Sequence, residues 1–306
     1  MIIDDSLLRR DEKAAFELRA LFEKHGYSRF FMGRFEEYDL YAGNKDFLAD
    51  DRMISFTDID GTLMALKPDV TLSVIRHTSD LPGQLRKVYY NENVYRAGRG
   101  DSGFREIMQA GLECIGEVKD EDICQTVFMA AESLNVLGGR CVLNISNLSF
   151  VTDVFAAAKL RPESYGHALR FVREKNAPAI RDFCRSENIA PEGRELLERL
   201  IAVHGPLGAT LESIRGMCPD SAALKRLESV SAYLDRLGKA DGVFLDFSIV
   251  SNMAYYDGMV FQGYMEGIPE SVLSGGQYDA LARKMGKKAG AIGFAVYLNK
   301  LEYLDK

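Results

Sequence analysis

The sequence lacks the features of a membrane-bound or disulfide-bonded protein. No run approaches the about 18 apolar residues of a membrane-spanning helix, and the start, MIIDDSLLRRDEK, has no signal-peptide core. The five cysteines are widely spaced, with no CxxC pair and no Cys/His cluster. They predict buried thiols in a reducing compartment and no metal site. We therefore expect a cytoplasmic protein.

The sequence also has no net positive charge. The 38 Lys and Arg residues are outnumbered by 45 Asp and Glu, which gives a net charge of −7. This balance argues against a generally nucleic-acid-binding surface. The 306 residues are enough to bury a sizeable core, and they predict one large domain or a domain with an insertion.

The most informative stretch runs over residues 87–116. It predicts a strand ending near Arg96, a glycine-bearing loop over 98–103, and a returning strand. The period of two gives the returning strand an apolar face of Ala110, Leu112 and Cys114. Its other face carries Arg105, Gln109, Gly111 and Glu113. These groups suit a small zwitterionic ligand, although an ordinary half-buried strand with its polar face in water explains the same spacing.

The remaining pattern predicts an α+β fold. Helical spacing covers 5–25, 70–77, 120–137 and 151–160, and strands are expected over 29–41, 140–144, 243–249 and 254–264. A hairpin over 50–67 turns at Asp60-Gly61. Residues 162–238 have helical spacing with no strand candidate and are interpreted as an insertion. The tail over 274–306 predicts a glycine turn, a helix, a second glycine turn and a last helix.

Two motifs resemble sites that their context does not support. Gly98-x-Gly100-x-x-Gly103 matches a dinucleotide fingerprint, but an alternating strand follows where that fingerprint needs a helix. The run Asp58-Ile59-Asp60-Gly61-Thr62-Leu63 is similar to the first motif of haloacid-dehalogenase phosphatases. No late GDxxxD pair accompanies it, so a hairpin turn is the favoured interpretation.

Four segments in sequence order are similar to one known family. They are FTDIDGTLMALKPDVTLSVIRH (56–77), the hairpin over 87–116, AYYDGMVFQGY (254–264), and LSGGQYDAL with GAIGFAVYLNKL (273–281 and 290–301). Together they resemble the catalytic domain of histidyl-tRNA synthetase and its paralogues. The resemblance implies a class II synthetase fold, with a mixed and mainly antiparallel sheet flanked by helices. Residues 1–161 and 239–306 would form this core, and 162–238 the helical insertion.

The resemblance also implies a pocket for L-histidine. Its residues would be Asp69, Thr71, Arg96, Gln109, Glu113, Tyr255 and Tyr256. The chemistry fits, because carboxylates favour an ammonium group, a guanidinium favours a carboxylate, and neutral phenols suit an imidazole. Each residue taken alone could equally be an ordinary surface or core polar group.

The nucleotide side departs from the family pattern. Gly98 stands for the Glu that reads adenine, Ile107 for the stacking aromatic, Ser251 for the catalytic Arg, and Lys300 for the motif 3 Arg. Adenylation needs fixed positive charge on the phosphates, and lysine lacks the planar fork of arginine. We therefore expect no catalytic residues, no cofactor and a degenerate nucleotide site.

Few residues follow Leu301, so we expect no C-terminal anticodon-binding domain and no tRNA partner. In this respect the sequence resembles the family's paralogue that regulates ATP phosphoribosyltransferase, the first enzyme of histidine biosynthesis. The resemblance implies a homodimer that joins the short catalytic subunit in a hetero-oligomer, activates it and helps transmit histidine feedback. Two alternatives stay open. One is a divergent ligase that adenylates histidine or another amino acid, and the other is a stand-alone amino-acid sensor.

Overall fold

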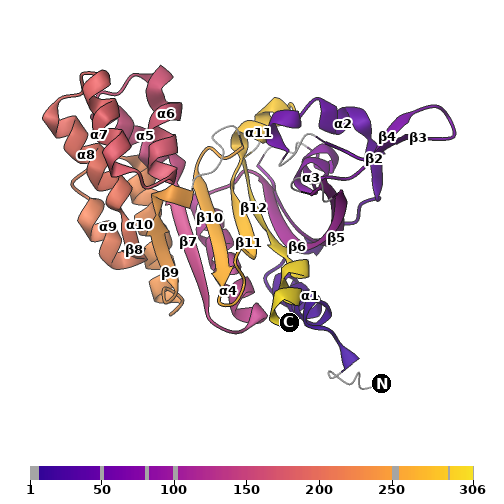
Figure 1. Cartoon of the computed structure of the whole chain (residues 1–306). Helices are drawn as coiled ribbons and strands as arrows, with labels where there is room; N and C mark the ends of the chain where they lie inside the picture. The colour runs from indigo at the N-terminus through magenta and orange to yellow at the C-terminus, as the bar shows by residue number, and fades with distance from the viewer. Residues whose placement is uncertain are drawn as a thin grey trace.

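The chain is described by a computed structural model over residues 7–48, 52–79, 83–98, 103–249, 255–288 and 290–305. Within these ranges one nine-stranded sheet crosses the molecule (Figure 1). Its pairs β1–β5 and β7–β9 are parallel and its other pairs antiparallel, which confirms the predicted mixed, mainly antiparallel sheet. In spatial order the strands are β1 (Ser28–Arg29), β5 (Leu85–Ala97), β6 (Phe104–Gly116), β12 (Gly290–Tyr297), β11 (Leu273–Gln277), β10 (Met259–Met265), β7 (Cys141–Asn147), β9 (Val243–Asp246) and β8 (His204–Pro206).

Helices cover both faces of this sheet. In chain order they are α1 (Arg10–Lys24), α2 (Tyr38–Ala42), α3 (Thr71–His77), α4 (Asp120–Leu137), α5 (Leu148–Ala157), α6 (Tyr165–Arg173), α7 (Ala177–Ser186), α8 (Pro191–Ala202), α9 (Leu207–Ile214), α10 (Ala222–Arg236) and α11 (Asp279–Lys284). Short 3₁₀ turns are η2 (Lys45–Phe47), η3 (Pro162–Ser164), η4 (Phe247–Ile249) and η5 (Leu298–Asp305). No helix in the described ranges combines the length and the apolar character that a bilayer crossing requires.

The predicted hairpin over 87–116 forms the long pair β5–β6. Alternate side chains of this pair point to opposite faces of the sheet, and each face belongs to a different hydrophobic core. Leu112 and Cys114 pack with Leu18 and Phe22 of α1 and with α4. On the opposite face, Tyr90 and the partly buried Ile107 belong to a second core beneath α3 and α11. The polar residues between them therefore face the second side, as the period of two predicts.

Local signals set the ends of the main helices. Asp120 begins α4 with an acidic first turn, which suits the positive end of the helix dipole, and Gly138 follows its end at φ 75°. The side chain of Asn147 accepts hydrogen bonds from the amides of Ser149 and Phe150 and caps α5. The predicted helix over 120–137 is confirmed without a shift.

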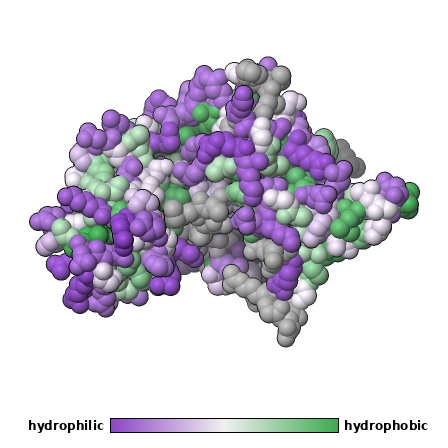
Figure 2. All heavy atoms as spheres, turned by 90° about the horizontal axis from the view of Figure 1, so that it is seen from above, coloured by the Kyte–Doolittle hydropathy of each residue, from purple (hydrophilic) through white to green (hydrophobic). Residues whose placement is uncertain are grey.

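A second, three-stranded sheet projects from the body of the molecule (Figure 1). It consists of β2 (Phe35–Glu37), β4 (Leu63–Leu66) and β3 (Ser55–Thr57). The hairpin β3–β4 turns at Gly61 with φ 90°, and Asp60 accepts a hydrogen bond from the Thr62 amide, so the Asp-rich motif is a turn. Figure 2 shows hydrophobic side chains at the tip of this projection, where Ile59 is fully exposed.

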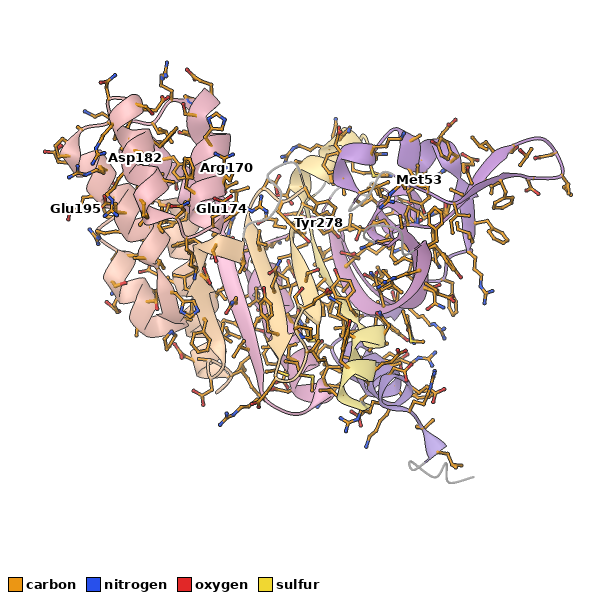
Figure 3. All side chains as sticks on the ribbon, viewed as in Figure 1. Met53, Arg170, Glu174, Asp182, Glu195 and Tyr278 are labelled. Carbon is orange, nitrogen blue, oxygen red and sulfur yellow. The ribbon has the colours of Figure 1, made fainter. Side chains whose placement is uncertain are left out.

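Residues 162–238 are mostly helical but do contain a strand, which corrects the prediction of none. β8 pairs antiparallel with β9, with Gly205 opposite Leu245, although its Gly-Pro sequence is typical of a break. The apolar core also runs without interruption from the sheet into these helices. Figure 3 places Arg170, Glu174, Asp182 and Glu195 in this group of helices, far from Tyr278 near the sheet.

Two other predictions were wrong. The segment over 29–41 contains only short strands, because β1 adds two residues to β5 and the chain turns into α2, which buries Leu40 and Tyr41. In the tail, the glycine-rich segments predicted as turns are strands β11 and β12 in the middle of the sheet. Their glycines have a packing cause that becomes clear at the site.

Candidate functional site

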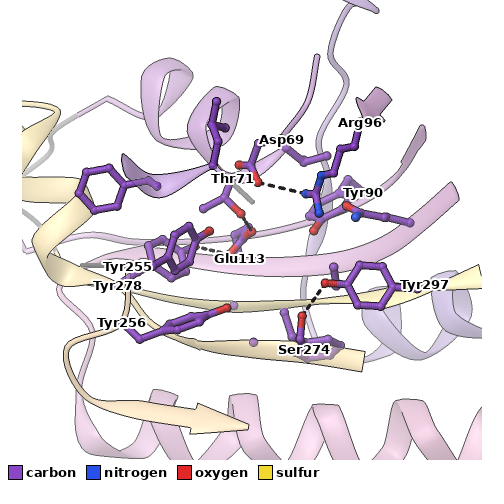
Figure 4. A pocket seen from close by; sticks show the side chains of 18 residues that line it. Asp69, Thr71, Tyr90, Arg96, Glu113, Tyr255, Tyr256, Ser274, Tyr278 and Tyr297 are labelled. Carbon is purple, nitrogen blue, oxygen red and sulfur yellow. Dashed lines mark hydrogen bonds and ion pairs between the residues drawn. The ribbon is translucent and has the colours of Figure 1, made fainter. Parts of the chain in front are cut away.

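A cavity of about 210 Å³ lies over β6, β11 and β12, beneath the segment that leads into α3 (Figure 4). The structure brings all seven residues of the predicted pocket to its wall: Asp69, Thr71, Arg96, Gln109, Glu113, Tyr255 and Tyr256. They come from segments as far apart as residues 69 and 256. Their convergence is a property of the fold, and their role in binding a ligand stays a prediction.

Arg96 of β5 holds the segment before α3, which covers the cavity. Its Nε donates a hydrogen bond of 2.8 Å to the carbonyl of Pro68, and its Nη2 lies 3.5 Å from Oδ2 of Asp69. The other oxygen of Asp69 accepts from the Leu72 amide at the start of α3. Burial raises the pKa of Asp69, and the Arg96 charge opposes that rise. The guanidinium faces the cavity, where it could hold a ligand carboxylate as well.

A second ion pair holds the same segment before α3. The ammonium of Lys67, which is 1% exposed, lies 2.5 Å from Oε2 of Glu92 on β5. Because Lys67 precedes Pro68 and Asp69 directly, this buried pair and the Arg96 contacts fix the segment at both ends. The position of the Asp69 carboxylate is thus determined by contacts with β5 and by the Leu72 amide of α3.

Glu113 is the most deeply buried acid of the wall, at 1% exposure. Its carboxyl accepts a 2.7 Å hydrogen bond from Thr71 and another from the Tyr278 hydroxyl. Burial is the main cause that raises its pKa to about 8, against the two hydrogen bonds, which lower it, and with Asp69, which raises it further. No described cation pairs with Glu113. A cationic ligand group beside Glu113 would lower this pKa and favour the charged carboxylate.

Gly275 and Gly293 line the cavity, and at these and neighbouring glycines other atoms occupy the space that a Cβ would need. A Cβ on Gly293 would collide with the Glu113 carboxylate, and one on Gly111 with the Tyr90 ring. Gly276 is covered in the same way by the ring of Tyr256. This close approach explains why central strands here have a sequence that resembles turns.

Aromatic side chains close the rest of the wall. The rings of Tyr255 and Tyr256 meet edge to face at 4.6 Å between centroids, and Tyr278 packs against Tyr255 at 6.0 Å. Burial raises the pKa of Tyr255 well above its usual value, so its phenol stays neutral. Gln109 is buried at 3% exposure and lines the cavity, and its amide has no hydrogen-bond partner in the part of the chain that the structure describes.

The three described residues of the predicted nucleotide site lie outside this cavity. Gly98 accepts a hydrogen bond from Arg52 at the hairpin end, and Ile107 packs in the second core. Lys300 points away, with its ammonium 2.7 Å from the Ser271 carbonyl and 3.0 Å from Glu270. Ser251 falls outside the described residues. The exposed Arg105, at the outer end of β6, is likewise not part of the wall.

Several wall residues were not predicted as part of the site. They are Phe47, Tyr90, Ser274, Tyr278 and Tyr297, among others. Tyr90 could have been found, because it shares the period-of-two face of Arg96 on β5. Ser274 and Tyr297 could not, because the tail was interpreted as glycine turns and helices, with no strand.

Comparison with known proteins places this geometry in a family. A family model for histidyl-tRNA synthetase matches residues 4–301. The ATP phosphoribosyltransferase regulatory subunit of Caldanaerobacter subterraneus is 30% identical over 297 residues, which cover 93% of this chain and 76% of the relative. The protein of the same name from Clostridium novyi is 27% identical, with 93% and 70% covered.

Solved structures share the fold. An ATP phosphoribosyltransferase regulatory subunit/histidyl-tRNA synthetase from Bacillus halodurans C has a TM-score of 0.84 and 23% identity, covering 97% of this chain and 79% of that one. The ATP phosphoribosyl transferase (HisG:HisZ) complex from Thermotoga maritima contains a chain with a TM-score of 0.74 and 21% identity, covering 93% and 96%. At these identities the likeness shows the fold alone. Because the family model spans residues 4–301 of 306, the chain belongs to the histidyl-tRNA synthetase family.

Proposed function

We propose that this protein is a regulatory subunit of ATP phosphoribosyltransferase in histidine biosynthesis and does not itself adenylate an amino acid. It binds the short catalytic subunit, activates it and helps transmit histidine feedback. The names of its relatives from Caldanaerobacter subterraneus and Clostridium novyi support the regulatory role. The HisG:HisZ complex from Thermotoga maritima, which contains a chain of the same fold, supports the choice of partner.

The observation that carries the proposal is a cavity of amino-acid size whose wall, among the described residues, includes Arg96 but not Lys300. Arg96 offers a guanidinium for a carboxylate, and Asp69 and Glu113 offer carboxyl groups for an ammonium or an imidazole. Lys300, which would have to contact the phosphates of ATP, is held by Ser271 and Glu270 instead. These contacts favour a bound free histidine over a reacting one.

Feedback requires more than binding. Histidine changes the activity of the catalytic subunit only if it binds two states of the assembly with different affinities. We propose the cavity as the place where this difference arises. The protein would act as a homodimer within the hetero-oligomer.

Reconstitution tests the proposal. The purified protein is mixed with the short catalytic subunit, and formation of phosphoribosyl-ATP from ATP and phosphoribosyl pyrophosphate is followed with and without histidine. We expect co-elution of the two proteins, a higher rate on mixing, and inhibition by histidine. Histidine-dependent exchange of pyrophosphate into ATP by this protein alone would contradict the proposal and favour the ligase alternative.

Matched arginine variants test the site. Arg96→Met removes a charge-assisted hydrogen bond worth about 1.5–3 kcal/mol, so histidine affinity should fall by about tenfold or more. Arg140→Met changes an exposed arginine just before β7, outside the cavity wall, and should leave the affinity unchanged. Equal affinities in the two variants would show that histidine binds elsewhere.

A further inference from the structure

One end of the cavity is lined by a hydrogen-bonded aromatic residue, Tyr297. Tyr297 is the last residue of β12 and the cross-strand partner of Gln109 on β6, which places its ring in the cavity wall. Its hydroxyl lies 2.6 Å from Oγ of Ser274 on β11. The hydroxyl of this ring is thus hydrogen-bonded to the neighbouring strand β11 (Figure 4).

Lys300, which does not line the cavity, lies against this ring. The Lys300 ammonium lies 4.8 Å from the ring centroid, while it also contacts Ser271 and Glu270. The Tyr297 ring therefore separates the interior of the cavity from the cation that follows on η5. A molecule seated in the cavity meets the ring before it can reach Lys300.

Figure 4 shows Arg96 and Tyr297 at one end of the cavity and Tyr255, Tyr256 and Tyr278 at the other. A ligand whose carboxylate contacts Arg96 would direct any extension of that carboxyl group toward Tyr297. We propose that Tyr297, held by Ser274, is a specificity-determining wall that admits a free amino acid and excludes derivatives with a bulky carboxyl substituent, such as an aminoacyl nucleotide. This inference rests on the proposed function, because it assumes an amino acid held by Arg96.

The test compares two ligands by isothermal titration calorimetry on the full chain. They are L-histidine and histidyl-sulfamoyl adenosine, a stable mimic of the aminoacyl nucleotide. The wild-type protein should bind histidine and bind the mimic at least about tenfold more weakly, because the ring clashes with the added nucleoside. Tyr297→Ala should bind the mimic at least about tenfold more tightly than the wild type does, with histidine affinity changed far less.

Two further variants separate the ring from its hydrogen bond and from a general effect. Tyr297→Phe keeps the ring and loses one neutral hydrogen bond, so affinity for the mimic should change by no more than about fivefold. Tyr303→Ala removes an exposed tyrosine of η5 outside the cavity wall and should change neither affinity. The wild-type comparison needs no variant, so the inference stays open to refutation if Tyr297→Ala does not fold.

The outcomes distinguish this inference from the proposed function. Equal wild-type affinities for the two ligands would refute the proposed role of Tyr297. A Tyr297→Ala protein that binds histidine but has no higher affinity for the mimic would refute it as well. Either result leaves histidine binding intact. If the wild type binds no histidine but Tyr297→Ala binds the mimic more tightly than the wild type does, the excluding role of Tyr297 is supported and the proposed histidine site is contradicted.

Discussion

The buried acid Glu113 should make the stability of the free protein depend on pH in an unusual direction. Most carboxyl groups have a lowered pKa in the folded state and lose stabilisation in acid. The pKa of Glu113 is instead raised, from an ordinary 4.5 to about 8, mainly because burial disfavours its charged form. Between these two values the folded protein holds a proton that the unfolded chain has released. The free energy of unfolding should therefore fall as the pH rises from about 4.5 to about 8.

The magnitude follows from the size of the shift. Each pH unit within that window changes the contribution of one such group by about 1.4 kcal/mol. From about pH 5.5 to about pH 8, a span of roughly 2.5 units, Glu113 should thus remove roughly 3 kcal/mol of stability. Glu113→Gln keeps the shape of the neutral acid, and Gln can still accept one hydrogen bond from Thr71 or Tyr278, but it cannot ionise.

The assay is urea unfolding of both proteins, without histidine, at several pH values across this range. Other groups of the cavity, including Asp69 with its own raised pKa, titrate in both proteins, so the difference between the two profiles isolates Glu113. The free energy of unfolding of the wild type, relative to that of Glu113→Gln, should fall as the pH rises. Parallel profiles would refute the reasoning, because they would mean that Glu113 has a similar pKa in the folded and unfolded states.

Three further changes test the contacts around the site. Gly293→Ala places a Cβ against the Glu113 carboxylate, so calorimetry should detect no histidine binding and urea unfolding a loss of roughly 1–3 kcal/mol; normal binding would refute the close approach. Lys67→Met leaves Glu92 without its cation and should cost about 3 kcal/mol in urea unfolding, whereas an unchanged midpoint would show that the pair contributes little. Lys300→Met should leave histidine affinity in calorimetry unaltered, and a large loss would place Lys300 in the site.

Sequence patterns predicted the parts of the site whose residues alternate in an ordinary way. The hairpin β5–β6 was predicted because Gln109 and Glu113 share one face while Leu112 and Cys114 share the other. Helix α4 was predicted from its acidic start and its glycine end. In these segments the local preference and the tertiary packing favour the same structure, so local reasoning was sufficient.

Prediction failed where a neighbour from a distant segment decides the structure. Gly275 and Gly276 in β11 have the sequence of a turn, yet they form a central strand because the rings of Phe261 and Tyr256 fill the space above them. The same holds for Gly293 beside Glu113. No pattern within β11 or β12 contains the position of those neighbours, so the glycines were explained only by the assembled sheet. The wall residues carried by these two strands, Ser274 and Tyr297, were missed for the same reason.

The contacts of α3 bear on how an occupied cavity could influence the rest of the molecule. Its first residue, Thr71, contacts Glu113, and two residues later Ser73 donates a hydrogen bond of 3.0 Å to Glu36 on β2. At the end of the helix, Arg76 pairs with Glu37 at 2.8 Å. One short helix thus joins the wall of the cavity to the projecting three-stranded sheet. Spatial contact alone is not coupling, because histidine can shift only an element whose arrangements it binds with different affinity. α3 meets the structural part of that requirement, since a ligand group that attracts the Glu113 carboxyl competes directly with the hydrogen bond from Thr71.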